Sequence, residues 1–221
     1  MSRRAVLFDL DGTLVDTAPD LIRCLHELMA EAGHRPLPER ALQSTVSHGA
    51  RMMVSYAFAL PPQDPRAIDL ESELVRRYHE RLAAESRLFP GMAEVLAALE
   101  RDHVAWGVVT NKPAALTQPL LQRLGLWERA GVVVSGDTLA RAKPHPAPVE
   151  HAAAALGLRP GSCWAVGDAR RDIQSAAAAG TPALVALFGY LHAGDRPAAW
   201  GAQGLLERPL DLLGWLDHER S

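Results

Sequence analysis

The sequence predicts an α/β fold: a Rossmann-like, doubly wound parallel sheet forms the core, and an α-helical cap is inserted into it. Three observations support this prediction. Short apolar runs alternate with helical patterns over most of the chain, and several of these runs end in an acidic or hydroxyl residue. Residues 17–87 interrupt the alternation with helical patterns alone. Alternating strands and helices are typical of a parallel sheet covered on both faces.

Five short runs have the composition of buried strands. They comprise residues 5–11, 106–111, 132–137, 163–168 and 183–187. Helical patterns follow at residues 91–101, 114–124, 146–156 and 170–179, and Pro119 is expected to kink or split the second of these. Ligands of doubly wound sheets bind beyond the carboxyl ends of the strands, so the polar residues that end these runs are site candidates.

The region from residue 17 to residue 87 contains no convincing strand. Two helical stripes stand out in it: Leu21, Leu25, Leu28 and Ala32, then Leu70, Leu74, Tyr78 and Leu82. Asp64 and Pro65 form a good start for the second helix. A connection of this length with helices of its own favours an inserted lobe over a simple crossover. We therefore expect a core of residues 1–16 and 88–221, with residues 17–87 as a cap over the strand ends.

Bulk composition excludes several classes of protein. The 221 residues carry a formal net charge of -3, with 48% hydrophobic and 22% charged residues, which is ordinary for a globular protein and gives no broad basic surface for nucleic acid. No apolar run is long enough to span a membrane, and Asp9 and Asp11 interrupt the run that would resemble a signal peptide. Cys24 and Cys163 lie in unrelated contexts, so we expect a reduced, cytoplasmic protein.

The first chemical motif is Asp9-Leu10-Asp11-Gly12-Thr13, at the end of the first predicted strand. A turn at Gly12 can aim both carboxylates into one pocket. A carboxylate beside Mg²⁺ can attack phosphorus, and a second carboxyl group can protonate the leaving alcohol and later deprotonate water. Two surface acids before a turn are the alternative, although the motif closes an apolar strand, which favours the pocket.

Three further motifs follow later strands. Thr110 and Asn111 precede a helix, where a hydroxyl and backbone N–H groups suit phosphate oxygens, although alone they are a commonplace helix cap. Lys143 is one of only two lysines among 23 basic residues, the other being Lys112, so we expect a compact ammonium to neutralise phosphate there. Asp168 either caps a helix or completes an oxygen-rich Mg²⁺ site with Asp9 and the backbone carbonyl of Asp11.

The fourth motif also contains Asp172, one helical turn after Asp168. From that position its carboxylate can face the same way as Asp168. We expect it to orient a metal-bound water or Lys143 rather than to bind the ion itself.

Taken together and in this order, the four motifs resemble those of the haloacid dehalogenase (HAD) superfamily, in the branch with a helical cap between the first and second motifs. The resemblance covers essentially the whole chain. It implies that Asp9 is the nucleophile and Asp11 the acid/base, that Gly12, Thr110 and Asn111 hold phosphate, and that Lys143 stabilises charge. It also implies Mg²⁺ as the cofactor, held by Asp9, Asp11 and Asp168, with Asp172 in support. An aspartate at the second acidic position points to a phosphatase or phosphomutase.

Within that branch, segments 47–54 and 106–113, Gly189-Tyr190 and Trp200-Gly201-Ala202 are similar to those of phosphoglycolate phosphatases and of N-acetylmuramic acid 6-phosphate phosphatases. This implies a small phosphorylated metabolite bearing a carboxylate as substrate, hydrolysed through a phosphoaspartate. Selectivity must come from the cap, where Gly49 permits close backbone approach, Arg51 is a candidate for the carboxylate, and His48 is a weaker candidate for substrate contact. Both could instead be solvated surface residues.

Two other functions stay open at this point. A phosphomutase would need a second phosphate site in the cap, for which the basic residues give no clear pattern. A non-catalytic binding protein could share the scaffold, but none of the main acids is missing. The sequence predicts neither the physiological substrate nor the oligomeric state.

Overall fold

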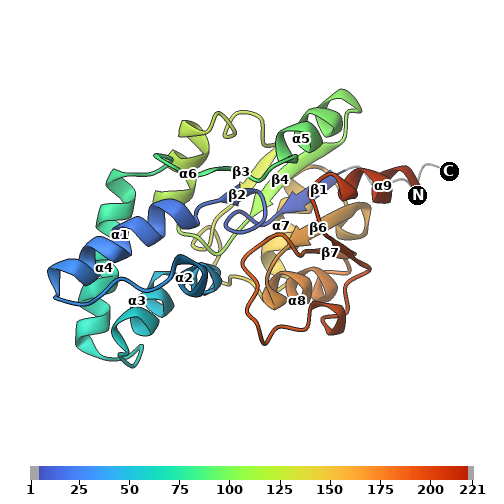
Figure 1. The fold of residues 1–221 in the computed structure, drawn as a ribbon. Helices are drawn as coiled ribbons and strands as arrows, with labels where there is room; N and C mark the ends of the chain where they lie inside the picture. The colour runs from blue at the N-terminus through green and yellow to red at the C-terminus, as the bar shows by residue number, and fades with distance from the viewer. Residues whose placement is uncertain (1–4, 219–221) are drawn as a thin grey trace.

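The computed structural model describes residues 5–218, and a six-stranded sheet forms its centre (Figure 1). The strands are β1 (Ala5–Phe8), β4 (Ala105–Val109), β5 (Val132–Val134), β6 (Cys163–Gly167), β7 (Ala183–Ala186) and β8 (Gly204–Leu206). All pairings are parallel, in the order β5-β4-β1-β6-β7-β8. The predicted fold class is confirmed. Because β1 lies between β4 and β6, the residues that follow these three strands are neighbours.

Helices cover both faces of this sheet, which explains why its strands are apolar throughout. They are α5 (Met92–Arg101), α6 (Ala114–Arg123), α7 (Ala147–Ala155), α8 (Arg170–Ala178) and α9 (Asp211–His218), with short 3₁₀ turns at Pro160–Ser162 and Pro197–Ala199. Successive residues of a strand point to opposite faces. Val6 and Phe8 accordingly join the core cluster that includes α5, α6 and α9, whereas Ala5 and Leu7 pack with α7.

Four helices occupy the region expected to form a cap. They are α1 (Ala18–Glu31), α2 (Glu39–Val46), α3 (Ala50–Phe58) and α4 (Pro65–Glu80), grouped on the left of Figure 1. Asp64 caps α4 by accepting a hydrogen bond of 2.9 Å from the backbone N–H of Arg66. Leu25 and Leu74 of the predicted stripes are buried in the same hydrophobic cluster as the core residues, whereas Ala32 follows the end of α1 and is exposed. We keep residues 17–87 as the proposed cap.

A two-stranded antiparallel ribbon joins the entrance and exit of this helical region. It consists of β2 (Val15–Asp16) and β3 (Arg87–Leu88), with Val15 opposite Leu88 and Asp16 opposite Arg87. The sequence predicted no strand between residues 17 and 87, so the extended conformation of Arg87 is a small correction. The ribbon places the two connections between the sheet and the helical region side by side.

The structure differs from the sequence-based expectation in a few further places. The strands end earlier than the predicted runs, so Asp9, Thr110 and Asp168 lie just beyond them. Pro119 lies within one uninterrupted helix, α6, and does not split it. Neither β8 nor α9 was predicted. Residues 1–4 and 219–221 of the expected core lie outside the described residues.

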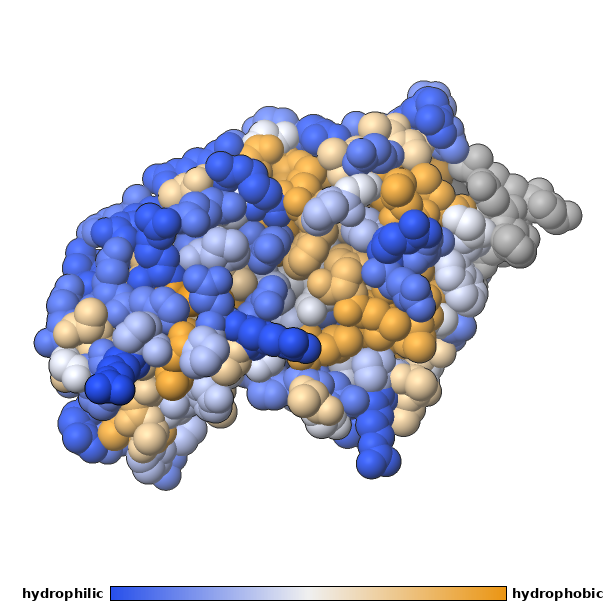
Figure 2. Space-filling view, viewed as in Figure 1, coloured by the Kyte–Doolittle hydropathy of each residue, from blue (hydrophilic) through white to orange (hydrophobic). Residues whose placement is uncertain are grey.

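The surface differs between the two parts of the molecule. On the face drawn in Figure 2, hydrophilic residues dominate the side of the helical region, and larger hydrophobic areas lie over the side of the sheet. Among residues 5–218, no helix combines the length and apolar character needed to cross a lipid bilayer.

Candidate active site

The loop after β1 folds tightly because its residues can adopt unusual backbone conformations. Gly12 has a φ of +84°, and a Cβ atom placed there would lie 2.2 Å from Oδ2 of Asp168. Only glycine fits this position without displacing the carboxylate. The loop is closed by backbone hydrogen bonds from Leu14 to the carbonyls of Asp9 and Leu10, at 3.2 and 3.1 Å. This turn brings the first motif against the fourth.

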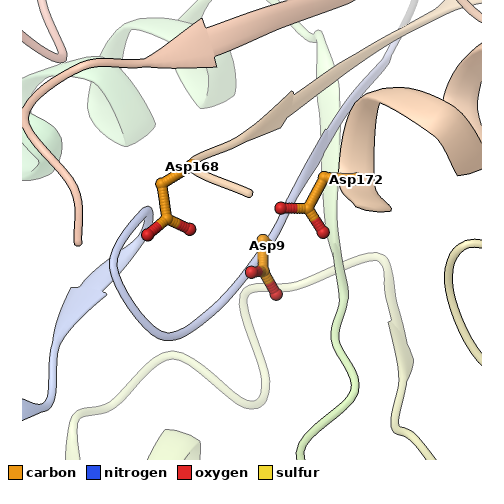
Figure 3. A group of neighbouring side chains, drawn as sticks. All are labelled: Asp9, Asp168 and Asp172. Carbon is orange, nitrogen blue, oxygen red and sulfur yellow. The ribbon is translucent and has the colours of Figure 1, made fainter. Parts of the chain in front are cut away.

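Three carboxylates meet beyond the strand ends. Asp9 follows β1, Asp168 follows β6, and Asp172 lies in the first turn of α8. One oxygen from each residue lies within 4.8 Å of the others, and Figure 3 shows the three side chains converging. They are 6%, 1% and 5% exposed, so water screens them poorly. Such a cluster needs positive charge nearby.

Asp168 is fixed by donors from three segments. Its Oδ1 accepts from the hydroxyl of Thr13 at 3.2 Å, and its Oδ2 accepts from the hydroxyl of Ser47 and the backbone N–H of Tyr190, both at 2.9 Å. Burial, followed by the negative charges of Asp9 and Asp172, raises the pKa of Asp168 to about 7. The carboxylate is therefore held ready for a cation.

Lys143 supplies positive charge at the other side of the cluster. Its Nζ lies 2.9 Å from Oδ1 of Asp9 and 2.7 Å from Oδ1 of Asp172, and it donates to the carbonyl of Val109 at 2.6 Å. Burial alone would lower the pKa of Lys143, but Asp172 and Asp9 outweigh that effect, and the net pKa is raised. The ammonium is therefore charged, and it forms one hydrogen bond, to Val109, and two ion pairs, with Asp9 and Asp172.

The backbone of Lys143 is clamped by the second motif. Asn111 donates from Nδ2 to the carbonyl of Lys143 at 2.9 Å and accepts from the N–H of Lys143 at 3.0 Å. Both polar ends of the amide are therefore engaged by one residue. These two hydrogen bonds hold the second and third motifs at a fixed position relative to each other.

Asp11 faces a different cation from Asp9. Its carboxylate lies 3.0 and 3.2 Å from Nζ of Lys112, and Oδ1 accepts from the hydroxyl of Thr17 at 2.6 Å. The ammonium of Lys112 also lies 4.5 Å from the ring centroid of Tyr78 on α4. Burial lowers and Asp11 raises the pKa of Lys112, with a raised pKa as the net result. The helical region thus reaches Asp11 through both Thr17 and Tyr78.

A cavity of about 300 Å³ opens over these groups. The core contributes Asp9, Asp11, Thr110, Asn111, Lys112, Pro113, Leu116 and Arg171, and the helical region contributes Leu21, Val46, Ser47, His48, Gly49, Ala50, Glu71, Val75 and Tyr78. Its volume is at the lower end of the range for small-molecule sites. The two acids of the first motif and the candidate selectivity residues His48 and Gly49 therefore line one cavity.

Most of the predicted site residues are brought together here. Thr110 lines the cavity, is buried, and its hydroxyl oxygen accepts from the backbone N–H of Lys112 at 3.2 Å. His48 lines the cavity as well, with its ring edge-on to that of His192 at 5.2 Å between centroids. Burial, then the charges of Arg171 and His192, lowers the pKa of His48, which favours the neutral imidazole.

Arg51 does not take the position that the sequence indicated. Its guanidinium pairs with the carboxylate of Glu71 and donates from Nη1 to the carbonyl of Pro62 at 3.0 Å. Glu71 lines the cavity and Arg51 does not. The structure therefore places Arg51 against Glu71 of α4 and not on the cavity wall, and direct contact between Arg51 and a substrate carboxylate stays a prediction.

Four residues in or beside the site make contacts that the sequence did not predict. Lys112 pairs with Asp11, Ser47 and Tyr190 hold Asp168, and Arg171 lines the cavity. The scarcity of lysine could have predicted a role for Lys112, because it is the only lysine besides Lys143. Nothing in the sequence pattern distinguishes Arg171 from its neighbour Arg170.

Known proteins of one family match this chain over most of its length. A model of the haloacid dehalogenase-like hydrolases matches residues 6–186. The chain is 43% identical over 217 residues to an N-acetylmuramic acid 6-phosphate phosphatase of Pseudomonas aeruginosa, covering 98% of this chain and 96% of that protein. It is also 43% identical over 209 residues to a phosphoglycolate phosphatase of Xanthomonas campestris pv. campestris, covering 95% and 94% of the two chains.

Solved structures give the same result. A predicted phosphoglycolate phosphatase from Haemophilus somnus superposes with a TM-score of 0.85 at 27% identity, covering 97% of this chain and 98% of that one. The family model matches most of the chain. The sequence identity of 43% to the two phosphatases is high enough to show common family membership. The chain therefore belongs to the haloacid dehalogenase-like hydrolases.

Proposed function

We propose that the protein is a Mg²⁺-dependent phosphomonoester hydrolase that acts on small phosphorylated metabolites. One observation carries this proposal: Asp9 and Asp11 line the same cavity, and each has its own buried lysine partner. A nucleophile and an acid/base beside one substrate chamber are what phosphoryl transfer through an enzyme carboxylate requires.

The donor set suits a magnesium ion. Asp9, Asp168 and the backbone carbonyl of Asp11 would hold it, since Mg²⁺ prefers oxygen ligands and usually keeps several waters. The raised pKa of Asp168 reflects burial first and then repulsion among the three acids, and a divalent cation would offset both effects. When bound, the ion neutralises charge on the phosphate and lets an anionic nucleophile approach. Asp172 supports this arrangement by orienting Lys143.

The residues divide the reaction into two steps. In the first, a carboxylate oxygen of Asp9 forms a bond to phosphorus, the bond from phosphorus to the ester oxygen breaks, and Asp11 gives a proton to the leaving alcohol. In the second, Asp11 takes a proton from water, whose oxygen bonds to phosphorus and releases phosphate from Asp9. Lys143 holds positive charge beside Asp9 throughout, and Gly12, Thr110 and Asn111 frame the phosphate.

The names of the relatives indicate the substrate class. One relative is named for N-acetylmuramic acid 6-phosphate and another for phosphoglycolate. Both compounds carry a carboxylate as well as a phosphate monoester. We extend that shared feature to this protein and propose a small phosphate ester with a carboxylate as its substrate.

The test is a panel assay of phosphate release with Mg²⁺ from 2-phosphoglycolate, N-acetylmuramic acid 6-phosphate, sugar phosphates and p-nitrophenyl phosphate. Asp9→Asn should abolish release and the trapping of beryllium fluoride, because an amide is not a nucleophile here. Asp69→Asn, the same change at an exposed position of α4, is the control and should retain full turnover. Turnover by Asp9→Asn would reject the covalent mechanism, and a need for a bisphosphate activator would indicate a mutase.

A further inference from the structure

Arg171 is the second residue of α8 and forms part of the cavity wall between the core and the helical region. Its Nη2 donates to the backbone carbonyl of Ser47. Its Nε is buried and has no hydrogen-bond partner within residues 5–218. Of the five N–H donors of the guanidinium, one on Nη2 therefore has a protein acceptor and the buried one on Nε has none. Leaving buried donors unsatisfied is costly, which is a reason to look for an acceptor that binds there.

Arg171 also differs from the other cations around the site in its ion pairing. Lys112 pairs with Asp11, Lys143 pairs with Asp9 and Asp172, and Arg51 pairs with Glu71. Across the described part of the chain, no carboxylate forms a salt bridge with Arg171. Its positive charge acts both on the carboxylate of its neighbour Asp172 and on the His48 imidazole, and it works to lower the pKa of each. A cavity that receives a doubly anionic phosphate thus retains one cation for a further anion.

The position of Arg171 ties this cation to the reacting groups. Ser47 accepts from Arg171 through its carbonyl and donates to Asp168 through its hydroxyl. One residue of the helical region therefore connects the guanidinium with the acidic cluster. A ligand group beside Arg171 would be held at a set position relative to Asp9, which lines the same cavity.

We propose that Arg171 forms an anion subsite that binds the carboxylate of the substrate, apart from the groups that hold its phosphate. The planar guanidinium fork matches a carboxylate and donates two parallel hydrogen bonds to it. This inference rests on the proposed phosphatase function and assigns to Arg171 the selectivity that the sequence attributed to Arg51. The ligand class is a phosphate monoester with a carboxylate on its alcohol portion.

The experiment compares matched esters with and without the carboxylate. The pairs are 2-phosphoglycolate against ethyl phosphate, and N-acetylmuramic acid 6-phosphate against N-acetylglucosamine 6-phosphate, which lacks the lactyl group. For each pair, kcat/KM is measured with Mg²⁺ and expressed as a ratio. Arg171→Gln should lower the ratio for the preferred pair by about 10- to 100-fold, as expected for loss of a charge-assisted bidentate contact. Arg171→Lys should give an intermediate ratio, since it keeps the charge and loses the fork.

Two matched controls accompany these variants. Arg170→Gln removes the same charge from the neighbouring, exposed residue and should leave the ratio and the turnover unchanged. Arg51→Gln tests the earlier candidate and should leave the ratio unchanged. A general loosening of the loop at Ser47 would lower turnover of both esters alike, so the ratio separates recognition from structural damage.

The outcomes distinguish this inference from the proposed function. An unchanged ratio in Arg171→Gln, with turnover in the parent enzyme, overturns the subsite and leaves the phosphatase intact. If the parent hydrolyses no ester, the subsite is tested by binding instead. Calorimetry then measures the affinity of the parent and of Arg171→Gln for 2-phosphoglycolate. Binding weakened at least about 10-fold by the variant supports the subsite although the function fails, and equal or absent binding overturns both. If only Arg51→Gln lowers the ratio, Arg51 and not Arg171 recognises the carboxylate of the substrate.

Discussion

Lys143 shows how much depends on the shape of a single cation. Its Nζ lies 2.6–2.9 Å from oxygen atoms of Asp9, Asp172 and the carbonyl of Val109, and the side chain is almost fully buried. An ammonium on a slim stem can satisfy three acceptors at once. The broad guanidinium of arginine would need space that the neighbouring buried groups already fill.

We therefore expect Lys143→Arg to lower kcat/KM at least about 100-fold, comparable to the loss of a preorganised charge-stabilising donor. The assay is phosphate release from p-nitrophenyl phosphate with Mg²⁺. Arg141→Lys, a reverse exchange at an exposed position two residues away, is the control and should be silent. Near-parent activity of Lys143→Arg, in a variant with an unchanged melting temperature, would contradict the argument from ammonium shape.

His48 allows a direct check on the charge of Arg171. Burial, then Arg171 and His192, places the pKa of His48 below its ordinary value of 6.5. Each positive neighbour disfavours the imidazolium, so removing one must raise the pKa. NMR titration of the His48 ring should give a pKa below 6.5 in the parent and a higher value in Arg171→Gln. An unchanged pKa in the variant would mean that Arg171 does not act on His48.

The residues of the first, third and fourth motifs could be predicted because their chemistry is encoded within a few positions. Asp9 and Asp11 follow one apolar strand, and Asp168 and Asp172 are one helical turn apart. The pairing of Arg51 with Glu71 could not be predicted, for the opposite reason. Its partner Glu71 is 20 positions away on another helix, and only packing of α3 against α4 brings the two together.

At the scale of elements, Tyr190 fastens the start of α1 to the core. Its hydroxyl oxygen accepts from the backbone N–H groups of Thr17 and Ala18 at 2.7 and 2.9 Å and donates to Asp16 at 2.6 Å. The first N–H groups of a helix have no partner within the helix, so this phenol satisfies donors that would otherwise be buried unpaired. The same residue holds Asp168 through its backbone.

Tyr190→Phe should therefore lower the free energy of unfolding by about 1–3 kcal/mol, the cost of leaving buried donors unsatisfied. Urea unfolding measures this change. Tyr56→Phe, on the half-exposed face of α3, makes the same atomic deletion and should change stability little. If both variants unfold at the same urea concentration as the parent, the hydrogen bonds at Tyr190 carry no net stability.

Element prediction succeeded where a local pattern repeats and failed where partners are distant. The buried strands β1, β4 and β6 are apolar runs with helices on both faces, which their composition reveals. β8 is only three residues long, includes a glycine, and forms an edge of the sheet through pairing with β7. β2 and β3 are two residues each and exist because they meet each other. Such elements depend on tertiary contacts that the sequence pattern does not contain.

At the scale of the molecule, the three buried carboxylates at one edge of the sheet destabilise the folded state. Lys143 compensates part of this charge, and the raised pKa of Asp168, to about 7, shows that burial and repulsion by Asp9 and Asp172 remain. A ligand that binds only the folded state stabilises it in proportion to its concentration over its Kd. Magnesium should therefore stabilise the whole protein, not only the site.

We expect Mg²⁺ at about 100 times its Kd to raise the melting temperature by about 5–10 °C, as follows from mass action in a domain of this size. Differential scanning fluorimetry with MgCl₂, against NaCl at equal ionic strength, measures the shift. Asp168→Asn should lose most of it, whereas Asp69→Asn should keep it. A shift of equal size in Asp168→Asn would place the ion elsewhere.

The ribbon formed by β2 and β3 has a consequence for how such a protein can diversify. The chain leaves the core at β2 and returns to it at β3, and these two strands are paired. The strand pairing of the six-stranded sheet therefore does not depend on how many residues lie between β2 and β3. Domain insertion is tolerated where the two ends of the inserted piece lie close together. One scaffold for phosphoryl transfer can thus accept segments of different length and composition over the same acids, and substrate choice can change by exchange of a whole insert rather than residue by residue.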